Sequence, residues 1–262
     1  MEFDNSESED DTTQKGFHHM NDSGTDTLFN LDLFGLNIEI QQAPDLPPLV
    51  AKDVGHGAVV WDAAIIFAKY LEHSPKFSGN SLEGKRIIEL GAGTGLSGLT
   101  MMLKGGIVTL TDTKAVLEHI TIANAEKVYS KYAIESSNNF NGAIRIKPLC
   151  EELDWTITYP DLSPNDLPYD FCVLTDCVFS PTLAPLLVEQ IRRVCSNKTE
   201  VIVCHEIRDE EANEAFLKYF GIYFKYSKVQ RKKLHPDYCN DLVQLIEGKK
   251  KRESKSKEKI IK

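Results

Sequence analysis

The segment Ile87–Gly98, which reads IIELGAGTGLSG, constrains the fold of this chain more than any other feature. A short apolar run is followed by glycines at 91, 93 and 95 and then by a stretch, 96–104, that we expect to be helical. Glycines in such a turn let the backbone bend sharply and let a ligand approach it with no Cβ in the way. Parallel α/β sheets bind ligands at this end of their strands, so the segment predicts both the fold class and a binding site.

The remaining sequence alternates between strand-like and helix-like patterns, as a sheet with helices on both faces requires. Before the sheet we expect a β-hairpin at 27–45, whose apolar residues alternate on either side of Phe34-Gly35, and an amphipathic helix at 58–72. The pattern predicts a seven-stranded, mostly parallel sheet. The expected strands are 86–90, 107–111, 144–149, 171–175, 200–205, 223–229 and 242–247, and the later helices are 114–129, 183–195 and 210–220.

Charge separates a central domain, residues 27–248, from two terminal tails. Residues 1–26 hold eight acidic side chains against one lysine, and residues 249–262 hold eight Lys or Arg against two glutamates. Segments so charged and so poor in apolar residues have little to bury, so we expect both tails to be disordered. The formal net charge of the chain is −9. Because the central domain is itself acidic, a nucleic-acid-binding surface is not expected.

Composition also bears on the compartment. The six cysteines form no Cys-x-x-Cys pair and lie mostly in apolar runs, which is typical of buried free thiols in a reducing compartment. No apolar run approaches the ~18 residues that a membrane-spanning helix needs, and the N-terminus is too polar and acidic for a secretory signal. Histidines and cysteines show no metal-ligand spacing. We expect a cytoplasmic protein without a metal, with the nucleus as a second location.

The residues around the glycine turn narrow the class of ligand. A P-loop motif is absent, whereas Gly93-x-Gly95-x-x-Gly98 formally matches a dinucleotide fingerprint. Glu89 would repel a pyrophosphate but would suit a cation. Asp112 lies 19 residues after Gly93, where nucleotide-binding sheets carry the acid that binds ribose, although it could instead cap the next helix. A nucleoside with a positively charged, phosphate-free tail fits both carboxylates, and S-adenosylmethionine is such a molecule.

Several short stretches carry a resemblance to a known family over roughly residues 28–248. They are Val59–Ala64 (VVWDAA), Glu89–Gly95 (ELGAGTG), Leu153–Trp155 (LDW), Thr175–Phe179 (TDCVF) and Glu206–Arg208 (EIR). Together they make the chain similar to the seven-β-strand protein-lysine methyltransferases, methyltransferase family 16. It is most similar to the branch that methylates valosin-containing protein and heat-shock chaperones. The glycine motif marks only a class I methyltransferase, whereas the Trp-Asp-Ala-Ala helix with the Asp-x-x-aromatic motif is more specific.

The resemblance implies a class I methyltransferase (Rossmann-like) fold, S-adenosylmethionine as cofactor, and a monomeric enzyme. Its partner would be a protein that presents a lysine, such as a chaperone or an AAA-type ATPase. Asp176 and Phe179 would form the substrate side, with Phe179 in place of the family's more common tyrosine. The expected cofactor-binding residues are Trp61, Glu89, Gly91, Ala92, Gly93, Asp112, Trp155 and Thr175.

Other interpretations stay open at this level. A methyltransferase acting on a small molecule or nucleic acid, an inactive binding module and an oxidoreductase could share this fold. The missing Asn-Pro-Pro-Tyr motif weakens the nucleic-acid alternative, and the intact Asp112 and Asp176 argue against an inactive module. Individual residues also have structural alternatives. Asp176 could cap the next helix, Glu206 and Arg208 could form a structural ion pair, and Trp61, Trp155 and Phe179 could be packing aromatics.

Overall fold

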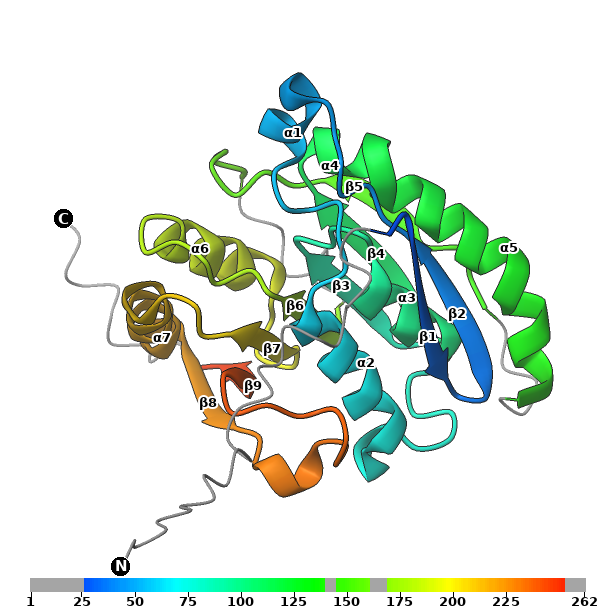
Figure 1. The fold of residues 1–262 in the computed structure, drawn as a ribbon. Helices are drawn as coiled ribbons and strands as arrows, with labels where there is room; N and C mark the ends of the chain where they lie inside the picture. Colours follow the sequence, from blue (N-terminus) through cyan, green and yellow to red (C-terminus); the bar gives the residue numbers. More distant parts are fainter. Residues whose placement is uncertain (1–25, 140–144, 161–168, 253–262) are drawn as a thin grey trace, which may run out of the picture.

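Figure 1 shows the fold in a computed structural model, which describes residues 26–139, 145–160 and 169–252. At its centre lies a seven-stranded sheet in the order β5-β4-β3-β6-β7-β9-β8. Neighbouring strands from β5 to β7 are parallel, whereas β9 runs antiparallel to both β7 and β8. The expected seven-stranded, mostly parallel sheet is therefore confirmed. The strands are β3 (Arg86–Leu90), β4 (Ile107–Asp112), β5 (Leu149–Glu152), β6 (Phe171–Thr175), β7 (Glu200–Glu206), β8 (Phe224–Lys228) and β9 (Val243–Lys250).

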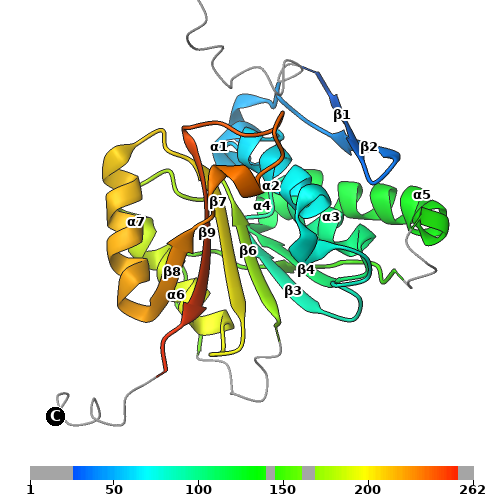
Figure 2. The ribbon, with the colours of Figure 1, turned by 90° about the horizontal axis from the view of Figure 1, so that it is seen from below.

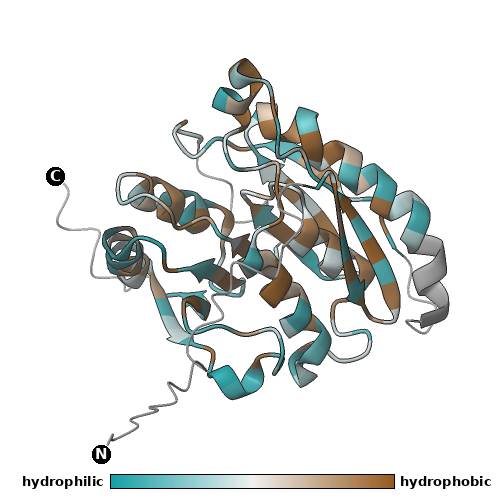
Figure 3. Cartoon of the chain, in the orientation of Figure 1, coloured by the Kyte–Doolittle hydropathy of each residue, from teal (hydrophilic) through white to brown (hydrophobic). Residues whose placement is uncertain are grey.

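Helices cover both faces of this sheet, as Figure 2 shows. Ile87 and Val173 belong to one core, with the hairpin, α2 and α3, whereas their neighbours Ile88 and Cys172 belong to a second core with α6 and α7. Successive strand residues point to opposite faces, so a sheet covered on both sides needs nearly unbroken apolar strands. Figure 3 shows brown stretches in the central strands, whereas the edge strand β8 is pale to teal. The main helices are α1 (Pro48–Val54), α2 (Asp62–His73), α3 (Leu96–Leu103), α5 (Ile122–Asn139), α6 (Ala184–Val194) and α7 (Glu210–Tyr223).

The strand order creates a topological switch point between β3 and β6. The chain passes from β3 through β4 to β5 at one edge, and then returns past β3 to form β6 on its other side. In open α/β sheets ligands bind in the crevice outside the carboxyl ends of strands at such a point. The loops that follow β3, β4, β5 and β6 all start from this end of the sheet.

The N-terminal hairpin pairs β1 (Leu28–Leu33) with β2 (Leu36–Gln41) and is confirmed. Phe34 and Gly35 both have positive φ angles, 56° and 78°, as a two-residue hairpin turn requires. Asn124 of α5 accepts a hydrogen bond from the backbone N–H of Gln41 and donates one to its carbonyl, at 2.8 and 3.0 Å. These bonds attach the hairpin to the helix beside it.

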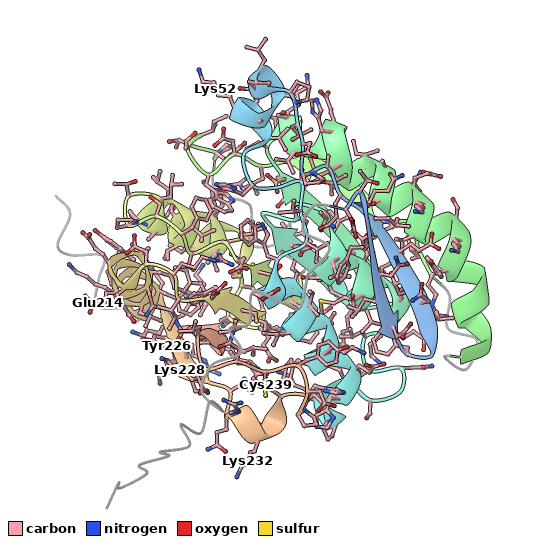
Figure 4. All side chains as sticks on the ribbon, viewed as in Figure 1. Lys52, Glu214, Tyr226, Lys228, Lys232 and Cys239 are labelled. Carbon is pink, nitrogen blue, oxygen red and sulfur yellow. The ribbon has the colours of Figure 1, made fainter. Side chains whose placement is uncertain are left out.

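The segment between the hairpin and the sheet differs from the prediction. A helix was expected at 58–72, but α2 begins at Asp62, and the unpredicted α1 precedes it. Trp61 is the N-cap residue of α2 and has extended backbone angles, φ −95° and ψ 150°. Figure 4 shows Lys52 on α1 at the rim of the molecule. The non-helical residues 55–61 are thereby free to form one wall of a cavity.

Two other boundaries are wrong. The third strand was expected at 144–149, but β5 is Leu149–Glu152, because this exposed edge strand takes its register from Thr109–Asp112 of β4. The last strand was expected to end at 247. β9 continues to Lys250, whose Nζ donates to the carbonyls of Arg192 and Cys195 at 3.0 Å. The acidic tail to residue 25 and the basic tail from 253 lie outside the described residues.

The described part of the chain has neither a membrane-spanning helix nor a metal-binding cluster. None of its helices is long and apolar enough to cross a membrane. Within the same residues no group of three His, Cys, Asp or Glu side chains is arranged to hold a metal ion. All six cysteines are free thiols, and four of them are buried.

Candidate active site

A cavity of about 680 Å³ opens at the switch point of the sheet. Its volume lies within the range of small-molecule sites. The ends of five strands and the loops that follow them supply one side of it, and the segment 52–61 covers the other. These residues are Gly91–Thr94 after β3, the β4 end Asp112 with Thr113, Leu153–Thr156 after β5, the β6 end Thr175 with Asp176, Cys177 and Phe179, and Arg208 and Asp209 after β7.

The structure brings nine of the ten predicted site residues to this cavity and leaves out Glu89. Their individual roles stay predictions, but their gathering around one space is an observation. The nine are Trp61, Gly91, Ala92, Gly93, Asp112, Trp155, Thr175, Asp176 and Phe179.

The glycine loop is shaped by the absence of side chains. Gly91 and Gly93 have φ angles of 65° and 55°. A Cβ on Gly91 would lie 2.7 Å from Cys177 Sγ and 2.8 Å from the ring of Trp155, and one on Gly93 would lie 3.0 Å from the carbonyl oxygen of Gly57. Both positions therefore need glycine for backbone conformation and for space.

Asp112 holds this loop from the end of the neighbouring strand. Its Oδ2 accepts a hydrogen bond from the N–H of Gly93 at 2.8 Å, and its Oδ1 accepts one from the N–H of Thr113 at 2.7 Å. Burial raises the pKa of this carboxyl above its usual value, and the two backbone donors partly offset that effect. The following short helix α4 (Lys114–Val116) has Thr113 as its N-cap, with no side-chain cap, so the helix-cap alternative for Asp112 is wrong.

Glu89 was expected among the cofactor-binding residues, but it does not line the cavity. Its side chain is fully buried, and Oε2 accepts a hydrogen bond from the N–H of Gly98 in α3 at 2.9 Å. A Cβ on Gly98 would lie 2.5 Å from that oxygen, so the helix approaches the strand here too closely for a side chain. Burial raises the pKa of Glu89 to about 8. The carboxyl packs beneath the loop and is not placed for contact with a cation in the cavity.

Asp176 lines the cavity directly after β6, in a conformation that is rare for a residue other than glycine. Its φ angle is 56°, in the left-handed region. Oδ1 accepts a hydrogen bond from the N–H of Glu206 at 3.0 Å, and Oδ2 accepts one from Nη2 of Arg208 at 3.0 Å. The next helix, α6, begins only at Ala184, so the helix-cap alternative for Asp176 is wrong.

Arg208 is a cavity residue that the sequence interpretation left as a structural ion pair. Its Nη2 lies 2.6 Å from Glu206 Oε2, so it bridges the carboxylates of Glu206 and Asp176. Its guanidinium carbon lies 4.4 Å from the ring centroid of Trp61. The ion pair thus exists, but it faces the cavity. In the sequence, the position of the EIR stretch directly after the fifth expected strand could have indicated that Arg208 lines the cavity.

The aromatic residues complete the wall. Trp61 Nε1 donates to the carbonyl of His56 at 3.0 Å, which fixes the ring beside the loop. The rings of Trp155 and Phe179 are 6.3 Å apart between centroids, and Phe179 is 53% exposed at the cavity mouth. Thr175 Oγ1 is hydrogen-bonded to Ser97 Oγ at 3.0 Å. The aromatics therefore border open space and do not merely fill the core.

Comparison with known proteins agrees with this architecture. A family model described as lysine methyltransferase matches residues 49–221. Protein N-lysine methyltransferase METTL21A of Mus musculus is 32% identical over 178 residues, which cover 68% of this chain and 73% of that protein. METTL21A of Danio rerio is 34% identical over 166 residues, covering 63% and 67%. EEF1A lysine methyltransferase 3 of Xenopus tropicalis is 32% identical over 182 residues, covering 69% and 72%.

A doubly wound sheet of seven strands, with a glycine-rich cavity at its switch point, is the architecture expected of a class I methyltransferase, and the family match supplies the class. The chain belongs to the lysine methyltransferase family. It is an enzyme, an S-adenosylmethionine-dependent protein-lysine methyltransferase, which confirms the function that the sequence motifs indicated.

Proposed function

We propose that the cavity binds S-adenosylmethionine on the side of Gly91–Gly93 and Asp112, and the side chain of a protein lysine on the side of Asp176 and Phe179. The observation that carries this assignment is that one cavity contains both a glycine cradle and a buried carboxylate beside aromatic rings. The two halves meet where Thr175 ends β6.

The cofactor side fits its ligand in charge and in shape. Asp112 has hydrogen-bond-accepting capacity left on both oxygens, which suits the two ribose hydroxyls. Trp155 lies flush against Gly91, because no Cβ separates them, and it offers an apolar face for the adenine. When bound, S-adenosylmethionine supplies an electrophilic methyl group, which an uncharged amine takes up as the sulfonium becomes a neutral thioether.

The acceptor side must present the lysine amine in its uncharged form. A lysine ammonium has a pKa of about 10.4 in water. Burial beside the rings of Trp61 and Phe179, next to the positive sulfonium of the bound cofactor, lowers that pKa because both effects disfavour the ammonium. The Asp176 carboxylate already accepts two hydrogen bonds, so its role is to orient the amine, and the released proton passes to water. The Phe179 ring packs along the apolar stem of the lysine.

The finer identity of the partner is also part of this proposal. The substrate is a folded protein with an exposed lysine, and the classes to test first are chaperones and AAA-type ATPases. EEF1A joins them, because it appears in the name of a relative. We further propose that the enzyme works as a monomer in the cytoplasm, and in the nucleus where its basic tail directs it there. The six free thiols support a reducing compartment.

A two-part experiment tests the proposal. Calorimetric titration of the purified chain with S-adenosylmethionine, with NAD as the control ligand, tests the cofactor side. Incubation with labelled S-adenosylmethionine and each candidate protein, followed by mass spectrometry of the labelled peptide, tests the acceptor side. We expect methyl groups on lysine only. Label in RNA or in small molecules, or on a residue other than lysine, would contradict the proposed acceptor.

A further inference from the structure

The guanidinium of Arg208 lies in an environment that would also suit a lysine ammonium. Its guanidinium lies over the Trp61 ring and bridges the carboxylates of Asp176 and Glu206. An aromatic face together with carboxylate oxygens is the environment that attracts alkylammonium ions. The sequence resemblance assigns Trp61 to the cofactor, so we expect these carboxylates to lie beside the bound cofactor.

The two carboxylates depend on this cation. The side chains of Asp176 and Glu206 are only 4% and 6% exposed, whereas that of Arg208 is 35% exposed. A buried carboxylate without a partner is strongly unfavourable, so the pair always requires a positive charge. Within the described residues, Arg208 is the one cation that forms ion pairs with them.

Arg208 is also placed where it can leave. β7 ends at Glu206 and α7 begins at Glu210, so Arg208 belongs to the short connection between them. Its partly exposed side chain can turn toward solvent without disturbing a strand or a helix. Asp209, the next residue, accepts a hydrogen bond from Ala212 N–H at 3.1 Å and anchors the start of α7 independently of Arg208.

We infer that Trp61, Asp176 and Glu206 form the binding site for the acceptor ammonium, and that Arg208 occupies this site in the free enzyme until the substrate lysine displaces it. The inference rests on the proposed function, since it concerns the same acceptor. Exchange of one cation for another keeps both buried carboxylates paired. Because Arg208 fills the site in the free enzyme, the vacant form that can bind lysine is rarely populated. The apparent affinity is therefore low for any lysine that is not held in place by a docked protein. Arg208 thereby acts as a filter against free lysine and lysine on unrelated peptides.

The test uses n-butylammonium chloride as a probe of lysine's stem and charge, and the fluorescence of Trp61 and Trp155 as the readout. These are the only two tryptophans of the chain, and both line the cavity. We expect Arg208→Ala to bind the probe about tenfold or more tightly than the parent, since the competing cation is gone. Arg231→Ala, which removes an exposed arginine paired with Asp241 elsewhere, should bind like the parent.

Methylguanidinium, which resembles the end of an arginine side chain, tests whether Arg208 blocks the acceptor site or assists catalysis. If Arg208 blocks the acceptor site, methylguanidinium will compete with the probe in Arg208→Ala and inhibit its methyl transfer. If Arg208 instead assists catalysis, the same ion will restore activity, and the inference is overturned. Unchanged probe affinity also overturns it, as does a loss of S-adenosylmethionine affinity in Arg208→Ala, which would assign Arg208 to the cofactor's carboxylate. Arg208→Gln serves in the same assays if the alanine variant does not fold.

Because probe binding needs no turnover, the two proposals fail separately. A chain whose Arg208→Ala variant binds n-butylammonium tightly, but which methylates no lysine, would overturn the proposed function and leave the cation site in place. A chain that methylates a protein lysine, and whose Arg208→Ala variant shows no gain in probe affinity, would overturn only the role of Arg208.

Discussion

The carboxylate of Asp112, at the end of β4, accepts a hydrogen bond from the backbone N–H of Gly93 over 2.8 Å. One side chain thereby joins two neighbouring strand ends and fixes the loop that faces the cavity. The same carboxylate is the candidate acceptor for the ribose hydroxyls, so its two functions can be separated by choice of substitution.

We expect Asp112→Ala to weaken S-adenosylmethionine binding by roughly 10- to 150-fold, the equivalent of about 1.5–3 kcal/mol for a lost charge-assisted hydrogen bond. Asp112→Asn keeps an oxygen that can accept from Gly93, so its loop should stay closer to that of the parent. Calorimetry measures the affinities, and thermal unfolding of both variants serves as the control for folding. An affinity unchanged in the alanine variant would remove Asp112 from the cofactor site.

Gly91→Ala should both destabilise the protein and weaken cofactor binding, because the new Cβ meets Cys177 and Trp155 at under 3 Å and requires a φ of 65°. Gly35→Ala is the matched control, since its φ is 78° but nothing lies within 4 Å of the new Cβ. The left-handed conformation alone costs about 1–2 kcal/mol. We therefore expect urea unfolding to show about that loss for Gly35→Ala and a larger loss for Gly91→Ala. Equal losses would mean that the loop has room for a side chain.

Glu89 should make the stability of the parent depend on pH. Burial raises its pKa from 4.5 to about 8, so the folded protein binds a proton that the unfolded chain releases. The stability that this proton supports is complete below about pH 4.5 and is lost as pH rises toward about 8. Glu89→Gln, which is neutral at every pH, should reduce this decline. Thermal unfolding of both proteins from pH 5 to pH 8 measures the difference, and parallel curves would show that Glu89 does not titrate in this range.

A C-terminal truncation should reduce stability only when it removes part of β9. Removal of residues 1–24 and 253–262 should leave the melting temperature and methyl transfer nearly unchanged, because these segments are charged and have few apolar residues to bury. Removal from residue 249 should lower the melting temperature, since it deletes the end of β9 and the hydrogen bonds from Lys250. Equal melting temperatures for the two C-terminal truncations would show that the end of β9 contributes nothing.

Local sequence patterns predicted the sheet and most of the cavity, because most of the predicted site residues end or follow a strand and parallel strands end at the same edge. The directions in which side chains point could be predicted less well from the sequence. Glu89 lies within β3, and only the structure shows that its side chain packs under α3 and not toward the cavity. Arg208 was recognised as an ion-pair partner, but its position over Trp61 depends on contacts between segments that are 147 residues apart. The edge strand β5 was misplaced because an exposed edge lacks a strong apolar pattern.

Asp176→Asn should abolish most turnover while leaving cofactor affinity within a few-fold of the parent. Asparagine tolerates the left-handed conformation of this residue, and its oxygen can still accept the hydrogen bond from Glu206 N–H. What is lost is the charge that pairs with Arg208 in the free enzyme and orients the lysine amine in the complex. We expect turnover to fall by ~10²-fold or more, the scale of loss when a reacting group is misplaced by about 1 Å.

The matched control for this substitution is Asp209→Asn, which removes a carboxylate from the same cavity wall but keeps an oxygen for the N-cap of α7. Its turnover should stay close to that of the parent, because among the described residues Arg208 pairs with Asp176 and Glu206 and not with Asp209. The decisive measurement pairs cofactor titration with the methyl-transfer rate on each purified variant. Normal turnover in Asp176→Asn would remove the residue from the acceptor site. A parallel loss of cofactor binding and turnover would place Asp176 on the cofactor side, since a group that touches only the lysine cannot weaken binding of S-adenosylmethionine in the absence of substrate.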